Sequence, residues 1–179
     1  MPIAPQQYLV EKNGYFPGSK FPVLHYKENL QLPTFFPGKY VRSVFQENNW
    51  TNNWRSGIYT FHHYHSTAHE VMAVIDGRTI ILLGGINGRI VLLKKGDVIV
   101  IPAGVAHMNL GDENEITCIG GYPSGRSYDM NYGTPDEHPM VDINIRHLPI
   151  LDSGPLYGQD DPLISIWNSV QVQQKIKKH

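Results

Sequence analysis

The ten residues FHHYHSTAHE, at positions 61–70, contain four of the nine histidines of the chain and one glutamate. If the stretch is extended, His63 and His65 project from the same face, because side chains alternate along a β-strand. Glu70 begins the next stretch, and an antiparallel neighbouring strand can bring it back beside the two imidazoles. His107, much further along the chain, could close the site from another strand. Three imidazoles and a carboxylate suit a first-row divalent metal and leave coordination positions open for catalysis.

Two other histidines of the same stretch compete for these places. If the chain runs one residue differently before the second strand, His69 rather than Glu70 would point inward. Strand alternation places His62 on the face opposite His63. A metal-bound histidine also needs a hydrogen-bond acceptor for its second ring nitrogen. The candidates for that acceptor are Tyr59, Tyr64 and Asn109.

The composition indicates which elements must hold these residues. The chain has 179 residues, enough for one domain with a real core and too few for two domains of ordinary size. Only 17% of the residues are charged, whereas 17 glycines and 13 prolines supply many turns. This balance favours an all-β chain over one built from long charged helices.

The charge and the apolar pattern limit the partners and the compartment. A formal net charge of −1 offers no basic field, so we expect neither nucleic acid nor a membrane surface as partner. The most apolar stretch, RTIILLGGINGRIVLLKK, is interrupted by glycine, asparagine and arginine and is no membrane span. The first residues lack a signal-peptide pattern, and the single Cys118 cannot form an internal disulfide. We therefore expect a cytoplasmic protein.

Short apolar, β-branched stretches separated by turn residues follow one another from position 57. We expect six or seven strands, which lie within 57–65, 70–77, 78–85, 89–95, 96–104, 105–110 and 115–123. The pair Asn87-Gly88 marks a hairpin between two of them. Strands this short and this regularly spaced predict an antiparallel sandwich or a closed barrel.

The flanking segments are less regular. Residues 1–55 are rich in proline and predict an arm packed on the barrel, with a short helix within 40–50. Residues 56–122 form the barrel core. Residues 123–179 form a loop and a C-terminal extension of the same domain. In that extension we expect a strand at 140–150, an extended tail at 152–168 with a solvated turn at Asp160-Asp161, and a frayed helix at 171–179.

The spacing of the candidate ligands resembles two motifs of the cupin superfamily. The first motif reads G-x5-H-x-H-x4-E-x6-G and is carried by Gly57, His63, His65, Glu70 and Gly77. The second reads G-x5-P-x-G-x2-H and is carried by Gly96, Pro102, Gly104 and His107. The second motif normally ends in asparagine four residues after its histidine, where this chain has Gly111. That asparagine is not a ligand in the family, so the departure concerns a turn and not the metal site.

The resemblance implies the double-stranded β-helix of the cupins, an antiparallel β-barrel or jelly roll, with an N-terminal arm and an extended C-terminal tail. It also implies one divalent transition metal (Fe, Mn, Ni, Zn or Cu) bound by His63, His65, Glu70 and His107. The segment WRSGIYTFHHYHSTAHE, with GGYP downstream, is similar to a group of small bacterial single-domain cupins of unassigned function. Because cupins often dimerise by sharing edge strands or N-terminal arms, we expect a homodimer formed through the proline-rich arm.

The function that follows is metal-dependent chemistry on a small polar molecule, of the dioxygenase, isomerase or decarboxylase type. Tyr122 and Arg126 could contact such a ligand at the mouth of the barrel. One alternative is a non-catalytic module that binds or senses a sugar or an acid. A second alternative is a metal-free, epimerase-like enzyme that uses a barrel histidine as general base.

Overall fold

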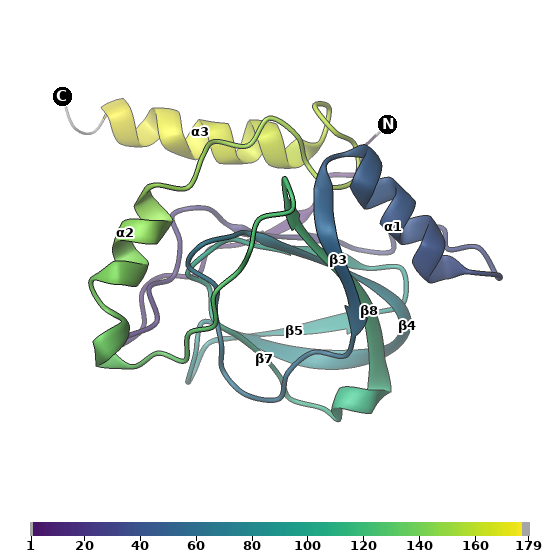
Figure 1. Ribbon diagram of the computed structural model, residues 1–179, viewed down its shortest axis with the longest axis horizontal. Coiled ribbons are helices and arrows are strands. Elements are labelled where there is room, and N and C mark those ends of the chain that lie inside the picture. The colour runs from purple at the N-terminus through teal and green to yellow at the C-terminus, as the bar shows by residue number, and fades with distance from the viewer. Residues whose placement is uncertain (1, 177–179) are drawn as a thin grey trace.

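The computed structural model describes residues 2–176, and it is dominated by antiparallel strands (Figure 1). The fold is therefore all-β, as the turn spacing predicts. The strands and helices are, in chain order, β1 (Gln6–Tyr8), β2 (Val23–Tyr26), α1 (Pro37–Glu47), β3 (Trp50–Ser56), β4 (Glu70–Leu83), β5 (Arg89–Lys94), β6 (Val98–Ile101), β7 (His107–Asn109), β8 (Ile116–Pro123), α2 (Met140–Arg146) and α3 (Pro162–Ile176). Two short 3-10 turns lie at Glu113–Glu115 and Pro135–Glu137.

Strand β4 connects the two layers of the barrel. Its first half pairs with β6 and β8 in a sheet of order β1-β2-β6-β4-β8-β3, and its second half pairs with β5 and β7. The two halves were expected as separate strands at 70–77 and 78–85, but the chain runs through as one. It bends at an irregularity between Val74 and Asp76, followed by Gly77 at φ 76°. A Cβ at Gly77 would lie 1.9 Å from the Glu115 carbonyl oxygen, so only glycine fits this bend.

Alternate residues of β4 serve two separate cores. Met72 and Val74 point between the two sheets, where they meet residues of β5, β6 and β8. Val71 and Ala73 point outward and are covered by α1 and α3, which pack on that side of the larger sheet (Figure 1). The helix expected within 40–50 is confirmed for residues 40–47, which belong to α1. The helix begins earlier, at Pro37, and Trp50 at the end of the expected range is the first residue of β3.

Several expectations about the flanks are wrong. Residues 57–65 bend at Thr60 and Phe61 and form only the isolated bridges of His63 with His107 and of Tyr64 with Asn131, so they make no regular strand. Residues 140–146 form α2 instead of a strand, and residues 162–168 belong to α3 instead of an extended tail. The helix expected at 171–179 is confirmed for residues 171–176, which continue α3, and residues 177–179 lie outside the described part of the chain. Within residues 1–55, β1 pairs with β2, and β2 in turn pairs with the barrel strand β6.

The start of α3 is fixed by a buried carboxylate. Asp161 is only 2% exposed, whereas a solvated turn was expected there. Its Oδ1 accepts hydrogen bonds from the Tyr26 hydroxyl at 2.5 Å and the Leu163 amide at 3.0 Å. Its Oδ2 accepts from the amides of Leu156 at 3.0 Å and Tyr157 at 3.2 Å. Asp161 therefore joins the C-terminal extension to β2 of the barrel.

Candidate metal centre

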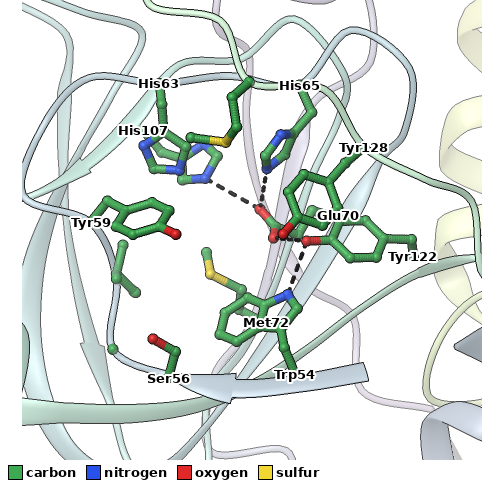
Figure 2. Close-up of a pocket in the computed structure, with 13 residues that line it drawn as sticks. Trp54, Ser56, Tyr59, His63, His65, Glu70, Met72, His107, Tyr122 and Tyr128 are labelled. Atoms are coloured by element: carbon green, nitrogen blue, oxygen red, sulfur yellow. Dashed lines mark hydrogen bonds and ion pairs between the residues drawn. The ribbon is translucent and has the colours of Figure 1, made fainter. Parts of the chain in front are cut away.

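Three histidines meet at one end of the barrel interior (Figure 2). His63 and His65 come from the extended segment before β4, and His107 is the first residue of β7. The backbones of His63 and His107 pair directly, with the His107 amide donating to the His63 carbonyl at 2.9 Å. One ring nitrogen from each of the three residues lies within 4.8 Å of the others, and all three side chains are buried. Such a cluster could hold a metal ion.

Alternation along residues 61–65 holds although the segment is not a regular strand. His63 and His65 both face the pocket, whereas Tyr64 points away and donates its hydroxyl to Glu137 at 2.7 Å. The backbone amide of Tyr64 also donates to Asn131, so the opposite face of the segment is held by a different part of the chain. The prediction that His63 and His65 share one face agrees with this geometry.

Backbone carbonyls determine which nitrogen of each histidine carries the proton. The Nδ1 atoms of the three rings lie 3.0, 2.6 and 3.2 Å from the carbonyl oxygens of Phe61, Asp129 and Val105, in the order His63, His65 and His107. Because a carbonyl only accepts, each Nδ1 must donate, and Nε2 of the neutral ring is left with its lone pair free. The acceptors suggested from the sequence, Tyr59, Tyr64 and Asn109, do not take this part.

Glu70, the first residue of β4, points at the same cluster. Its Oε2 lies 3.3 Å from Nε2 of both His65 and His107. Its Oε1 accepts from the Tyr122 hydroxyl at 3.0 Å, and that hydroxyl accepts from Trp54 Nε1 at 2.9 Å (Figure 2). Glu70 is 4% exposed, and among the described residues its Oε2 has no hydrogen-bond donor unless Nε2 of His65 or His107 is protonated.

The electrostatics of the pocket favour positive charge at this point. Burial would raise the pKa of Glu70, but the His65 and His107 imidazoles lower it well below its usual range. Burial would lower the pKa of His65, but the Glu70 carboxylate outweighs it and raises that pKa. Burial, together with the neighbouring His107, lowers the pKa of His63 to about 3, so this ring is neutral at pH 7. The neutral His63 ring and the buried Glu70 carboxylate thus lie in one pocket, and either a proton on a neighbouring imidazole or a cation must balance the charge of the carboxylate.

The two competing histidines lie elsewhere. Nδ1 of His69 accepts from the Ala103 amide at 3.0 Å, and its ring meets Trp167 of α3 edge-on at 4.8 Å, outside the histidine cluster. His62 packs against Phe16 with ring centroids 5.6 Å apart, on the side away from the cluster. Of the two alternatives for the fourth position, the geometry therefore brings Glu70 to the cluster and not His69.

The cluster opens into a pocket of about 140 Å³. This is close to the size of an engineered cavity that admits benzene, of roughly 150 Å³. Tyr122, expected at the mouth of the barrel, lines the pocket, whereas Arg126 lies away from it and donates to the Thr67 carbonyl. No lysine or arginine lines the pocket in the part of the chain that the structure describes. The walls are mainly aromatic or thioether side chains, from Trp54, Tyr59, Met72, Tyr122, Tyr128 and Met130.

Sequence reasoning missed the contribution of residues 128–130. Tyr128 stacks on Tyr122 with ring centroids 4.7 Å apart and meets His65 at 4.9 Å. Asp129 supplies the carbonyl that holds His65, and Met130 lines the pocket. These residues lie in an irregular loop without periodicity, so no pattern in the sequence marks them.

Comparison with known proteins shows the family to which the chain belongs. A family model described as Cupin matches residues 50–123. The uncharacterized protein YjlB of Bacillus subtilis (strain 168) is 32% identical over 163 residues, which cover 90% of this chain and 96% of YjlB. The chain belongs to the cupin superfamily. The resemblance drawn from the two motifs is thereby confirmed, together with the barrel that it implies.

Solved cupin structures are more distant. An acireductone dioxygenase from Bacillus anthracis, with a cadmium ion in its active centre, is 18% identical at a TM-score of 0.41 and covers 60% of this chain and 82% of its own. A DUF861 family protein from Thermotoga maritima is 20% identical at a TM-score of 0.33 and covers 56% of this chain and 96% of its own. Similarities this weak say nothing about the chemistry of this cupin. No helix among residues 2–176 is long and apolar enough to cross a membrane.

Proposed function

We propose that this cupin is a metal-dependent enzyme that acts on a small polar molecule, with one divalent transition metal held by His63, His65, Glu70 and His107. The observation that carries the proposal is the convergence of three ring nitrogens and a carboxylate oxygen on one buried space. The three Nδ1–H groups are used by backbone carbonyls, so each Nε2 is available to the pocket, and Glu70 Oε2 lies 3.3 Å from two of these nitrogens. A divalent cation among these four groups would satisfy all of them at once.

The same observation weighs against the metal-free alternative. An epimerase-like enzyme needs one histidine free to take a proton from its substrate. Here Glu70 Oε2 lies equally close, at 3.3 Å, to the nitrogens of His65 and His107, so a general base at either ring would compete with a carboxylate for its proton. This arrangement favours a shared cation over a single base.

When bound, the metal would act as a Lewis acid on a carbonyl or enolate oxygen or, as iron, would take part in dioxygen chemistry. The residues of the chain would bind and orient the substrate around it. Aromatic walls on several sides would exclude water, and the Ser56 side chain adds a hydroxyl to the lining. Because no lysine or arginine among the described residues lines the pocket, the substrate would be held without an ion pair to a cationic side chain.

We propose a reaction of the dioxygenase, isomerase or decarboxylase type. We also propose a cytoplasmic location, with which the single, buried Cys118 accords.

Metal analysis tests the proposal first. Protein purified without an affinity tag, stripped and reloaded with Fe(II), Mn(II), Ni(II), Zn(II) or Cu(II), is expected to retain about one ion per chain with at least one of these metals. Retention below about 0.2 ion per chain with every metal would contradict the proposal.

A second experiment separates catalysis from binding. Metal-loaded and stripped protein would be incubated with a small-molecule extract that is then analysed by mass spectrometry. An enzyme is expected to consume a compound and form a product only in the loaded sample. A compound that is retained by the loaded protein but returned unchanged would instead support the non-catalytic binding module.

The hydroxyl of Tyr122 is expected to contribute to metal affinity by orienting Glu70. Tyr122→Phe keeps the ring but removes the donor to Glu70 Oε1, so we expect the Kd for metal to rise about tenfold, as measured by competition with a chelator. The matched control is Tyr128→Phe, which removes a hydroxyl from the tyrosine that stacks on Tyr122. This variant should leave the Kd for metal unchanged. Equal affinity of Tyr122→Phe and wild type would show that Glu70 does not depend on this hydrogen bond.

A further inference from the structure

The His65 ring is held differently from the other two rings of the cluster. The carbonyls that accept from those two rings belong to Phe61 and Val105, each two residues before its histidine. The carbonyl that accepts from His65 belongs to Asp129, 64 residues further along the chain, at 2.6 Å. The orientation of His65 therefore depends on how the loop that contains Asp129 is fixed, whereas the other two rings are oriented locally.

This loop is fastened by the carboxylate of Asp129 itself. Its Oδ1 accepts from the amides of Ser66 at 2.7 Å and Thr67 at 3.1 Å. Its Oδ2 accepts from the hydroxyl of Ser66 and from Nδ2 of Asn131 at 2.8 Å. The amide of Asp129 donates to the hydroxyl of Thr67 at 3.1 Å. One residue of the loop thus binds both of the residues that follow His65.

Other hydrogen bonds join the same two segments around this carboxylate. Tyr64 and Asn131 exchange backbone hydrogen bonds in both directions, each at 3.0 Å. The Ser66 hydroxyl, which is fully buried, also accepts from Nδ2 of Asn144 in α2 at 2.9 Å. Neither segment belongs to a regular strand, so these bonds replace the ladder that would otherwise hold them together.

The loop also forms one wall of the pocket. Tyr128 precedes Asp129 and Met130 follows it, and both line the pocket. Figure 2 shows Tyr128 beside His65, and its ring stacks on Tyr122 at 4.7 Å. Asp129 itself neither lines the pocket nor belongs to the histidine cluster. It would therefore act through its neighbours and not directly on a metal or a substrate.

We infer that Asp129 is a positioning residue of the candidate metal centre. Its carboxylate fixes the loop on Ser66 and Thr67, and its carbonyl then holds the His65 ring, so one residue sets both a ligand and the wall beside it. Any residue here would have the carbonyl, but the carboxylate is what places that carbonyl against His65. The functional meaning of the inference rests on the proposed function, whereas the position of the ring can be tested without metal.

Side-chain NMR of the metal-free, ¹⁵N-labelled chain tests the inference. The Nδ1–H proton of His65 is expected to exchange slowly with water in the wild type, because the Asp129 carbonyl accepts it. Asp129→Ala should release the loop and accelerate this exchange at least about tenfold. The corresponding protons of His63 and His107, whose acceptors are local, should be unchanged. Asp129→Asn keeps an acceptor oxygen for the two backbone amides and should stay within about threefold of the wild type.

Metal affinity provides the functional measurement. Asp129→Ala is expected to raise the Kd for metal about tenfold in competition with a chelator, because the second nitrogen of a ligand loses its acceptor. Asp161→Ala serves as the control, since it removes another carboxylate with several donors, at the start of α3. It should lower stability without changing the Kd or the exchange at His65. Circular dichroism shows whether each variant is folded, and Asp161→Asn replaces a control that is not.

If Asp129→Ala does not fold, Ser66→Ala removes one donor to the carboxylate and should still accelerate the exchange at His65 about threefold. Unchanged exchange would overturn the inference. Equal acceleration at all three histidines would overturn it too, because Asp129 would then stabilise the fold in general. Faster exchange with a wild-type Kd would show that the metal does not depend on this position of the ring, which also contradicts the inference.

The inference and the proposed function fail in different ways. A wild type that retains no metal would refute the proposed function. The NMR measurement on the metal-free chain would still decide whether Asp129 positions the His65 ring, because it involves no metal at all.

Discussion

The His107→Ala variant is expected to lose its metal, with the Kd raised at least about 100-fold above that of the wild type. His107 contributes one of the four proposed ligands and is the one that enters from a separate strand, β7. Its removal leaves Glu70 with only one of its two histidine neighbours. The backbone pairing of His107 with His63 does not involve the side chain, so the barrel should remain folded. Metal content by mass spectrometry and Kd by chelator competition measure the effect.

The matched control for this variant is His62→Ala. His62 lies next to His63 in sequence but packs against Phe16, so its loss should leave about one metal per chain. If His62→Ala lost the metal and His107→Ala kept it, the extended segment would present its other face to the ion. If both variants kept it, the metal would be bound elsewhere on the chain.

The Asp161→Ala variant is expected to lose about 4 kcal/mol of the free energy of unfolding. The Asp161 carboxylate accepts from the Tyr26 hydroxyl and from three backbone amides, and it is 2% exposed. Alanine would leave these donors buried without acceptors, and it would also remove the side chain that caps the start of α3. Urea denaturation of the metal-free protein, followed by circular dichroism, measures the loss.

Asp160→Ala is the control for Asp161. Asp160 is the preceding residue, has the same charge and is exposed, so its replacement should change the free energy of unfolding by less than about 0.5 kcal/mol. A loss below about 1 kcal/mol for Asp161→Ala would mean that water replaces the carboxylate and that α3 is held mainly by Trp167, whose Nε1 donates to the Pro22 carbonyl.

The parts of this site that were predictable from sequence depend on local geometry. Alternation along an extended chain is a property of the backbone alone, so it placed His63 and His65 together although residues 57–65 form no regular strand. Motif spacing added Glu70 and His107, because the cupin barrel brings the starts of β4 and β7 to the same end of its interior.

The parts that were not predictable depend on contacts between distant segments. Asp161 is the same type of residue as its exposed neighbour Asp160. The two differ in their contacts with nearby backbone amides and with the hydroxyl of Tyr26, which is far away in the sequence. The stretch at 140–146 has the β-branched residues of a strand but forms α2, whose Val141 is buried. Local propensity predicts secondary structure poorly where contacts with distant residues determine it. The residues that pack against Val141 of α2, such as Tyr64 and Ala106, cannot be identified from the sequence.

The use of backbone carbonyls at all three histidines has an evolutionary consequence. In many metal sites a side chain sets the protonation state of the ligand, so a change at that residue also alters the metal. Here the acceptors are the carbonyls of Phe61, Val105 and Asp129, which any residue would supply. If the three histidines are ligands, as we propose, we expect relatives of this protein to tolerate changes in the aromatic and thioether walls, because the backbone carbonyls that orient the rings do not depend on those side chains.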